Sequence, residues 1–250
     1  VLNKGSGSDD ATEVRRTIEG VLREAGRPFE LLLADGGKAL NRCADDAVLR
    51  ASRRGGVVVA AGGDGTSNTV PPAVLRSGCP FGVLPQGTFN YFSRLHGIPA
   101  DTAQATRLLL EGHVEPVQVG LVNERVFLVN ASVGLYPQLL EDREAFKARY
   151  GRSRVAALFA ALQTLLGAHR SLRLHVSARG QDRDLRTLTL FVGNNALQLE
   201  QVGLPQAQAL SQGQLAAVVL KPVGRLALLW LLLRGAFGRL GEADAVSSFA

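Results

Sequence analysis

Short apolar segments alternate with amphipathic segments through the first 113 residues of the chain. Apolar residues recur at helical spacing in residues 12–26 and 38–51, which predicts two helices that each pack by one face. The apolar runs at 29–34, 55–61 and 79–85 have the length of strands buried on both sides. This order predicts an α/β domain in which helices cover both faces of a parallel sheet.

The pattern changes near residue 114. Residues 115–122 and 125–133 predict strands joined by a turn at Asn123 and Glu124. Further strands are predicted at 171–178, 185–193 and 213–221, and helices at 137–148 and 153–168. We therefore predict two domains, an α/β domain over residues 1–113 and a β-rich, antiparallel domain over residues 114–250.

The totals restrict the functional classes only loosely. A net charge of +6 favours anionic partners such as nucleotide phosphates, acidic lipid headgroups or nucleic acid, and serves solubility equally well. The longest apolar run, residues 226–233, is far short of the roughly 20 residues of a spanning helix. We expect no signal peptide, and the two cysteines fit a reducing, cytoplasmic compartment. Because methionine is absent, we expect the natural chain to be longer.

The loop after the apolar run at 55–61 is the first candidate site. Gly62, Gly63 and Gly65 lack side chains, so their N–H groups can approach phosphate oxygens closely. Asp64 lies among them, and a carboxylate beside a polyphosphate is repelled unless it holds Mg²⁺ or accepts a hydroxyl proton. A tight strand-to-helix turn in which Asp64 binds backbone explains this loop equally well.

Two further loops have the same form. Pro85, Gly87, Thr88 and Asn90 follow the apolar run at 79–85, and residues 3–7 (Asn-Lys-Gly-Ser-Gly) follow the start of the chain. A dinucleotide fingerprint (Gly-x-Gly-x-x-Gly) does not fit, because Asn68 stands at the position of its last glycine. A P-loop does not fit either, because Ala39 stands where that motif has Ser or Thr after its Gly-Lys. Three such loops at one sheet edge suit a triphosphate better than a ligand with one phosphate.

These motifs resemble the diacylglycerol kinase catalytic-domain family, specifically compact bacterial lipid kinases related to sphingosine kinases. Residues 62–68 (Gly-Gly-Asp-Gly-Thr-Ser-Asn) and 85–90 (Pro-Gln-Gly-Thr-Phe-Asn) match its motifs in full, and residues 3–7 match its opening motif except at Lys4. Residues 129–144 and 191–205 resemble landmarks of its β-rich domain. The resemblance implies the fold shared by NAD kinases and diacylglycerol kinases.

The resemblance also implies an activity, the ATP-dependent phosphorylation of a lipid hydroxyl with Mg²⁺ held near Asp64. The lipid is expected to be diacylglycerol-like, phosphatidylglycerol or sphingoid, and to enter between the domains. The family's nucleotide-binding positions correspond to Asn3, Gly62, Gly63, Asp64, Gly65, Thr66, Asn68, Gly87, Thr88 and Asn90. The family's catalytic base lies in a motif that we expect beyond Ala250, so Asp64 is not assigned the role of catalytic base.

The chain also departs from the family pattern. Thr69 and Tyr91 stand where the family commonly has acids, and Gln212 and Ala216 replace acids of a segment that builds a structural metal site in some relatives. These departures keep open a catalytically inactive nucleotide- or lipid-binding regulator. An NAD kinase-like enzyme is a second alternative, because such enzymes also use the Gly-Gly-Asp-Gly-Thr motif and a β-rich second domain.

Residues 224–240 are the best candidate for contact with a membrane, because Arg225, Arg234 and Arg239 flank their apolar run. The arginines do not share one face, however, and apolar residues all round a helix favour core packing. We expect a cytoplasmic protein that binds the inner face of the membrane transiently and acts on a lipid substrate. No nucleic-acid partner is expected, and we allow for a homodimer.

Overall fold

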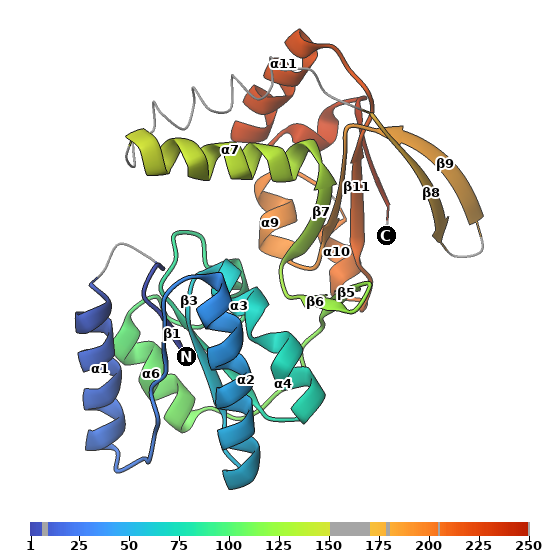
Figure 1. The fold of residues 1–250 in the computed structure, drawn as a ribbon. Helices are drawn as coiled ribbons and strands as arrows, with labels where there is room; N and C mark the ends of the chain where they lie inside the picture. The colour runs from blue at the N-terminus through green and yellow to red at the C-terminus, as the bar shows by residue number, and fades with distance from the viewer. Residues whose placement is uncertain (7–9, 151–170, 179–180, 205, 250) are drawn as a thin grey trace. The chain divides into compact units, whose positions relative to one another are not determined.

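The computed structural model describes residues 1–6, 10–150, 171–178, 181–204 and 206–249. The chain divides into two compact units, Val1–Val129 and Asn130–Ala250. The first unit is an α/β domain and the second is built on an antiparallel sheet (Figure 1). The fold class predicted from the sequence is therefore confirmed.

The first unit carries a four-stranded sheet in the order β2-β1-β3-β4, and its strand pairs are parallel. Its elements in chain order are β1 (Leu2–Asn3), α1 (Ala11–Glu24), β2 (Leu33–Ala34), α2 (Gly37–Arg54), β3 (Val58–Gly62), α3 (Asp64–Thr69), α4 (Pro71–Ser77), β4 (Phe81–Pro85), α5 (Tyr91–Leu95), α6 (Thr102–Glu111), β5 (Gly120–Val122) and β6 (Arg125–Phe127).

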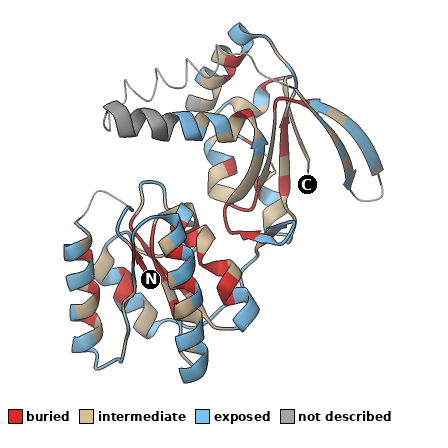
Figure 2. Ribbon diagram, in the orientation of Figure 1, coloured by how far each residue is buried: buried red, intermediate tan, exposed pale blue. Residues whose placement is uncertain are grey.

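Helices cover both faces of this sheet because side chains along a strand alternate between its faces. In β3, Ala60 joins a core cluster with Leu40 of α2 and Val74 of α4. The next residue, Ala61, joins a second cluster with Ile18 of α1. Figure 2 shows buried residues concentrated along the strands of this unit and on the helix faces toward them.

The starts and ends of the helices follow from local chemistry. The side chain of Asp10 caps α1 by accepting a hydrogen bond from the N–H of Thr12 at 2.9 Å. At the C-terminal end of α2, Gly55 adopts a left-handed conformation with φ of 62°, which glycine tolerates without a steric penalty. Both helices therefore form where the apolar periodicity predicts them.

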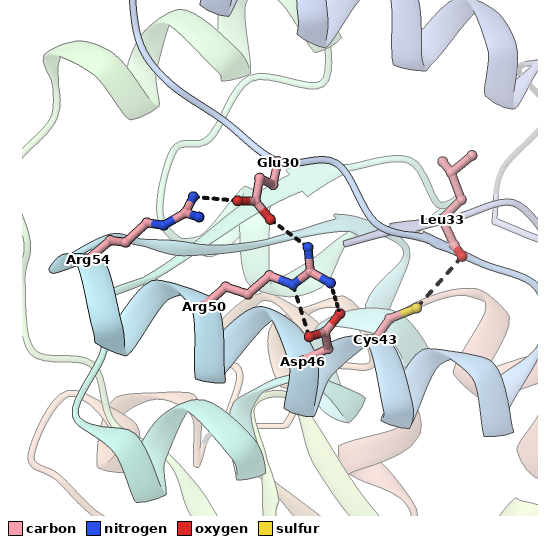
Figure 3. A network of polar contacts seen from close by, with 6 residues as sticks. All are labelled: Glu30, Leu33, Cys43, Asp46, Arg50 and Arg54. Atoms are coloured by element: carbon pink, nitrogen blue, oxygen red, sulfur yellow. Dashed lines mark hydrogen bonds and ion pairs between the residues drawn. The ribbon is translucent and has the colours of Figure 1, made fainter.

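A polar network joins α2 to the segment that precedes β2 (Figure 3). The guanidinium of Arg50 binds Asp46 on its own helix and reaches Glu30 at 2.7 Å, and Arg54 also donates to Glu30. The Sγ atom of Cys43 lies 3.7 Å from the carbonyl oxygen of Leu33. The ion pairs are exposed, so their contribution to stability is small.

The hairpin of β5 and β6 belongs to the first unit. Leu128 and Val129, which follow β6, are buried in one cluster with Val83 and Phe92. The change of sequence pattern near residue 114 predicts a domain boundary after residue 113, whereas the chain divides into its two compact units after Val129. The hairpin is antiparallel, as its sequence predicts, but the two residues that follow it pack on the α/β core.

The second unit carries an antiparallel sheet in the order β12-β11-β10-β7. Strands β8 and β9 form a separate antiparallel hairpin (Figure 1). The described elements of this unit are β7 (Asn130–Gly134), α7 (Leu135–Tyr150), β8 (Leu172–Ala178), β9 (Gln181–Thr187), β10 (Thr189–Gly193), α9 (Ala196–Gln201), α10 (Ala207–Leu210), β11 (Ala216–Leu220), α11 (Arg225–Ala236), η1 (Leu240–Glu242) and β12 (Val246–Phe249). The helix predicted at 153–168 lies outside the described residues.

Two apolar clusters hold the second unit together. One joins Leu199 of α9 and Ala207 of α10 to Ala216 and Val218 of β11. The other joins Leu135 at the start of α7 to Leu188 and to Leu228 of α11. Within the described ranges, no helix is both long and apolar enough to cross a bilayer.

Candidate functional site

Three of the predicted loops begin at the same edge of the parallel sheet. Asn3 ends β1, Gly62 ends β3 and Pro85 ends β4. Gly62 and Pro85 are direct partners across the sheet, and Leu2 of β1 is paired with Ala61 of β3. Ligands of parallel sheets bind at the carboxyl ends of the strands, so this edge is the candidate site.

The first loop contacts the second through hydrogen bonds to one hydroxyl. The Nδ2 of Asn3 donates to the Oγ1 of Thr66 at 2.9 Å, and the hydroxyl of Ser6 lies 3.2 Å from the same oxygen. The Oδ1 of Asn3 accepts from the N–H of Gly5 at 3.2 Å. Asn3 thus shapes its own loop and fixes it to the start of α3.

The second and third loops meet backbone to backbone at two glycines. A Cβ added to Gly87 would lie 2.6 Å from the Cα of Gly63, and one added to Gly63 would lie 3.2 Å from the Cα of Gly87. A Cβ on Gly62 would lie 2.3 Å from the hydroxyl of Thr66. Side chains at these positions would push the loops apart, which explains the glycines.

Asn90 holds the third loop closed. Its Oδ1 accepts from the N–H of Gly87 at 2.9 Å, and its Nδ2 donates to the carbonyl of the same residue at 2.7 Å. Its φ of 48° is left-handed, a conformation that asparagine adopts more readily than most residues. Both polar atoms of this predicted nucleotide-binding side chain are therefore engaged with backbone.

Asp64 lies at the start of α3 and points to the start of α5. Its carboxylate accepts from the N–H of Phe92 at 3.5 Å, with the N–H groups of Asn90 and Tyr91 as further donors. Burial raises the pKa of Asp64 and outweighs the opposite effect of these donors and of Arg94. Contact with backbone, one of the two roles expected for Asp64, is therefore present.

Asn68 makes a contact that the sequence does not reveal. Its Oδ1 accepts from the N–H of Leu128 at 2.9 Å, which ties α3 to the residue that follows β6. The other predicted residues differ in exposure, because Thr66 is buried whereas Gly65 and Thr88 are exposed. Space is open beside Gly65, where an added Cβ would meet no atom within 4 Å.

An aromatic pair that the sequence reasoning missed follows Thr88. The rings of Phe89 and Tyr91 are stacked with centroids 5.6 Å apart, and the guanidinium of Arg94 lies 5.9 Å from the centre of the Tyr91 ring. Tyr91 is the residue that replaces a family acid, so an aromatic surface stands where a carboxylate is expected.

The residues at the sheet edge fit a nucleotide with its metal ion better than a metal held by protein alone. Among the described residues, no group of three or more His, Cys, Asp or Glu side chains can hold a metal ion. Mg²⁺ commonly binds through one or two carboxylates together with substrate phosphates and waters. A single carboxylate, Asp64, beside glycines that leave room for phosphates fits that mode.

Known proteins resemble both the sequence and the fold. A probable lipid kinase, YegS-like, of Cronobacter sakazakii is 30% identical over 161 residues, which are 60% of this chain and 50% of that protein. A diacylglycerol kinase of Staphylococcus aureus is 38% identical over 100 residues, which are 38% of this chain and 32% of that protein. The matched regions thus span half or less of these relatives.

A solved structure extends the likeness to the second unit. The crystal structure of a diacylglycerol kinase from Bacillus anthracis strain Sterne superposes with a TM-score of 0.66, covering 99% of this chain and 81% of that one. Its sequence identity of 21% supports the fold alone. Residues 1–122 match the family model of the diacylglycerol kinase catalytic domain. The chain is thus similar to the diacylglycerol kinase catalytic-domain family over residues 1–122, just under half of its length.

Proposed function

We propose that this protein transfers the γ-phosphate of ATP to the hydroxyl of a lipid. The observation that carries the proposal is the meeting of three loops at one edge of the parallel sheet, joined by the Asn3–Thr66 hydrogen bond and by the Gly63–Gly87 contact. These loops lie within the residues that match the diacylglycerol kinase catalytic domain. Relatives named lipid kinase and diacylglycerol kinase support the same class of reaction.

Some residues of the site hold the loops in shape, and others are open to contact with the nucleotide. The amides of Asn3, Asn68 and Asn90 are hydrogen bonded within the protein and hold the loops in place. Gly65 is exposed and has no atom within 4 Å of an added Cβ, so its backbone N–H is a position that phosphate oxygens can approach. ATP is therefore expected to bind mainly to backbone, with the exposed hydroxyl of Thr88 as an added donor.

We propose Asp64 as the residue whose carboxylate would bind Mg²⁺. When bound, Mg²⁺ neutralises phosphate charge as the phosphoryl group moves. The carboxylate of Asp64 is oriented by the N–H groups at the start of α5, which fixes it beside the glycine loop. We assign it no role as proton acceptor for the lipid hydroxyl.

The competing function is an inactive regulator that binds nucleotide or lipid without transfer. Its support is that Thr69 and Tyr91 occupy acid positions of the family: the Thr69 hydroxyl donates to the carbonyl of Gly65 at 2.8 Å, and the Tyr91 ring stacks on Phe89. An NAD kinase-like enzyme is the other alternative, and Asn68 and the Gly87–Asn90 loop favour the lipid kinase over it.

The test is transfer of label from γ-labelled ATP with Mg²⁺, using the full chain and vesicles that carry diacylglycerol, phosphatidylglycerol, a sphingoid base or ceramide. We expect label on one of these lipids. Label on NAD alone would replace the lipid assignment with the NAD kinase alternative. Nucleotide binding without transfer to any acceptor would support the regulator, and the absence of both binding and transfer would refute the proposal.

A further inference from the structure

Helix α11 carries apolar residues on two sides, and only one side is buried. Leu228 and Leu231 are buried, and Leu228 packs against Leu135 and Leu188. On the other side, the exposed fractions are 81% for Leu226, 60% for Trp230, 52% for Leu233 and 78% for Phe237, the residue directly after the helix. The expectation that residues 224–240 pack wholly as core is therefore wrong for this side.

The four exposed residues form one continuous line along the helix. They are separated by four, three and four positions, which places them on a single side at 3.6 residues per turn. We call Leu226, Trp230, Leu233 and Phe237 the α11 stripe. Single exposed apolar residues are ordinary on a protein surface, but a contiguous line of large ones marks an interaction site.

Basic residues lie at both ends of the α11 stripe. Arg225 is exposed at the start of the helix, and no ion pair with it is found in the part of the chain that the structure describes. Lys221 precedes it and donates to the backbone carbonyl of Asp244. At the other end, Arg234 and Arg239 share one acidic partner, Glu242.

The charge of this region is therefore positive. Residues 221–244 contain four Lys or Arg and two Asp or Glu, which leaves a net charge of +2. Cationic side chains around an apolar line with a tryptophan are the features of helices that lie in the plane of a membrane interface. Aromatic side chains such as Trp230 favour that depth because part of the ring is apolar and its N–H is polar.

We propose that the α11 stripe docks the protein on the surface of a bilayer that contains anionic phospholipid. The helix would lie along the membrane with the stripe among the acyl chains and Arg225 among the headgroups. A second copy of the chain fits less well, because four side chains fall short of the roughly 800 Å² per partner that stable interfaces bury. The proposal goes beyond the kinase reaction, since docking requires neither ATP nor an acceptor lipid.

The sequence provides a built-in probe, because Trp230 is the single tryptophan of the chain. We would titrate the full chain with phosphatidylglycerol vesicles and with phosphatidylcholine vesicles, without ATP, and record its fluorescence. With phosphatidylglycerol, the emission is expected to shift to shorter wavelength, to resist quenching by acrylamide and to be quenched by lipids brominated on their acyl chains. These signals report on Trp230 itself.

Variants separate the stripe from general surface properties. Leu226→Glu and Phe237→Glu are each expected to weaken vesicle binding by at least about tenfold, because each removes an apolar group that would enter the bilayer and adds repulsion from anionic headgroups. Arg225→Gln is expected to weaken binding by about fivefold. Leu75→Glu is the matched control, since Leu75 is also 60% exposed but lies on α4 in the first unit, and it is expected to bind as the natural chain does.

Three outcomes would overturn the proposal. The first is equal binding by Leu226→Glu and the natural chain, and the second is equal affinity for the two kinds of vesicle. The third is a Trp230 emission that is already blue-shifted and protected without vesicles, which would mean that another part of the chain or a second copy covers the stripe. Quenching of the natural chain by brominated lipid decides the matter even if a variant fails to fold.

Discussion

The loops at the sheet edge of the first unit and the α11 stripe of the second unit differ in whether their side chains have partners within the protein. In the loops, the polar groups of Asn3 and Asn90 find partners within the protein, and the surface that remains is glycine backbone. In the stripe, large apolar side chains such as Trp230 remain exposed. The difference teaches that the loops depend on exact backbone placement, whereas the stripe depends on the chemistry of its exposed groups.

The largest effect is expected from Asp64→Asn, which keeps an acceptor oxygen for the start of α5 and removes the charge. Phosphotransfer should fall about a thousandfold, because charge stabilisation by a bound metal is worth several kcal/mol. Steady-state transfer of label from ATP measures this, with circular dichroism as the control for folding. Activity within a few-fold of the natural chain would mean that Asp64 only caps the start of α5.

The stability of the same variant should depend on pH in a defined direction. Burial raises the pKa of Asp64, so the folded state holds this proton more tightly than the unfolded chain does. The associated stability is present below the unfolded pKa and is lost as pH rises through the raised pKa. The Tm of Asp64→Asn relative to the natural chain should therefore increase with pH across the acid range, and a constant difference would contradict burial as the cause.

Next in size is Gly87→Val, which places side-chain atoms against the backbone of Gly63 and separates two loops. We expect phosphotransfer to fall about a hundredfold, since a misplacement of about 1 Å can cost that much. Gly20→Val is the matched control, because Gly20 lies in α1 with no atom within 4 Å of an added Cβ. Comparable losses in both variants would mean that the Gly63–Gly87 contact has no special role.

A smaller effect is expected on stability at Asn90. Asn90→Ala should lower the free energy of unfolding by about 2 kcal/mol, from two lost hydrogen bonds and from the left-handed backbone. Asn90→Gly loses the same bonds without the strain, so about half that loss is expected. Urea unfolding of both variants measures the difference, and equal losses would show that the backbone conformation costs little.

The smallest effect is expected in the stripe. Leu226→Gln should change the free energy of unfolding by less than about 0.5 kcal/mol, because the side chain is exposed. Leu228→Ala, two residues along the same helix, should cost about 3 kcal/mol because that side chain is buried. Similar values for the two changes would erase the contrast between the two sides of α11.

The sequence predicts which loops meet but not how they are held. The glycine-rich motifs at 62–68 and 85–90 follow buried strands, and parallel strands bring their carboxyl ends to one edge. The partner of the Asn68 amide is Leu128, sixty positions away, and no local pattern indicates it. Such a hydrogen bond depends on tertiary packing, so Asn68 can be named as a site residue while its contact remains hidden.

Helix α11 and the domain boundary show the same limit. A helix that is apolar on two sides gives no sign of which side faces the core, so the exposure of Trp230 cannot be inferred from periodicity. The hairpin of β5 and β6 has the alternation of an antiparallel domain, yet Leu128 and Val129 bury against Phe92. In both cases the pattern predicts the element and tertiary packing decides what it touches.

The most direct test of the three-loop site is hydrogen–deuterium exchange of the full chain with and without Mg²⁺ and ATP, read by mass spectrometry. Residues 3–6, 62–69 and 85–91 come from separate parts of the sequence and meet at one sheet edge. We expect ATP to slow exchange in all three segments together and to leave α11 unchanged. Protection of only one segment, or protection confined to the second unit, would contradict a nucleotide site built by the three loops.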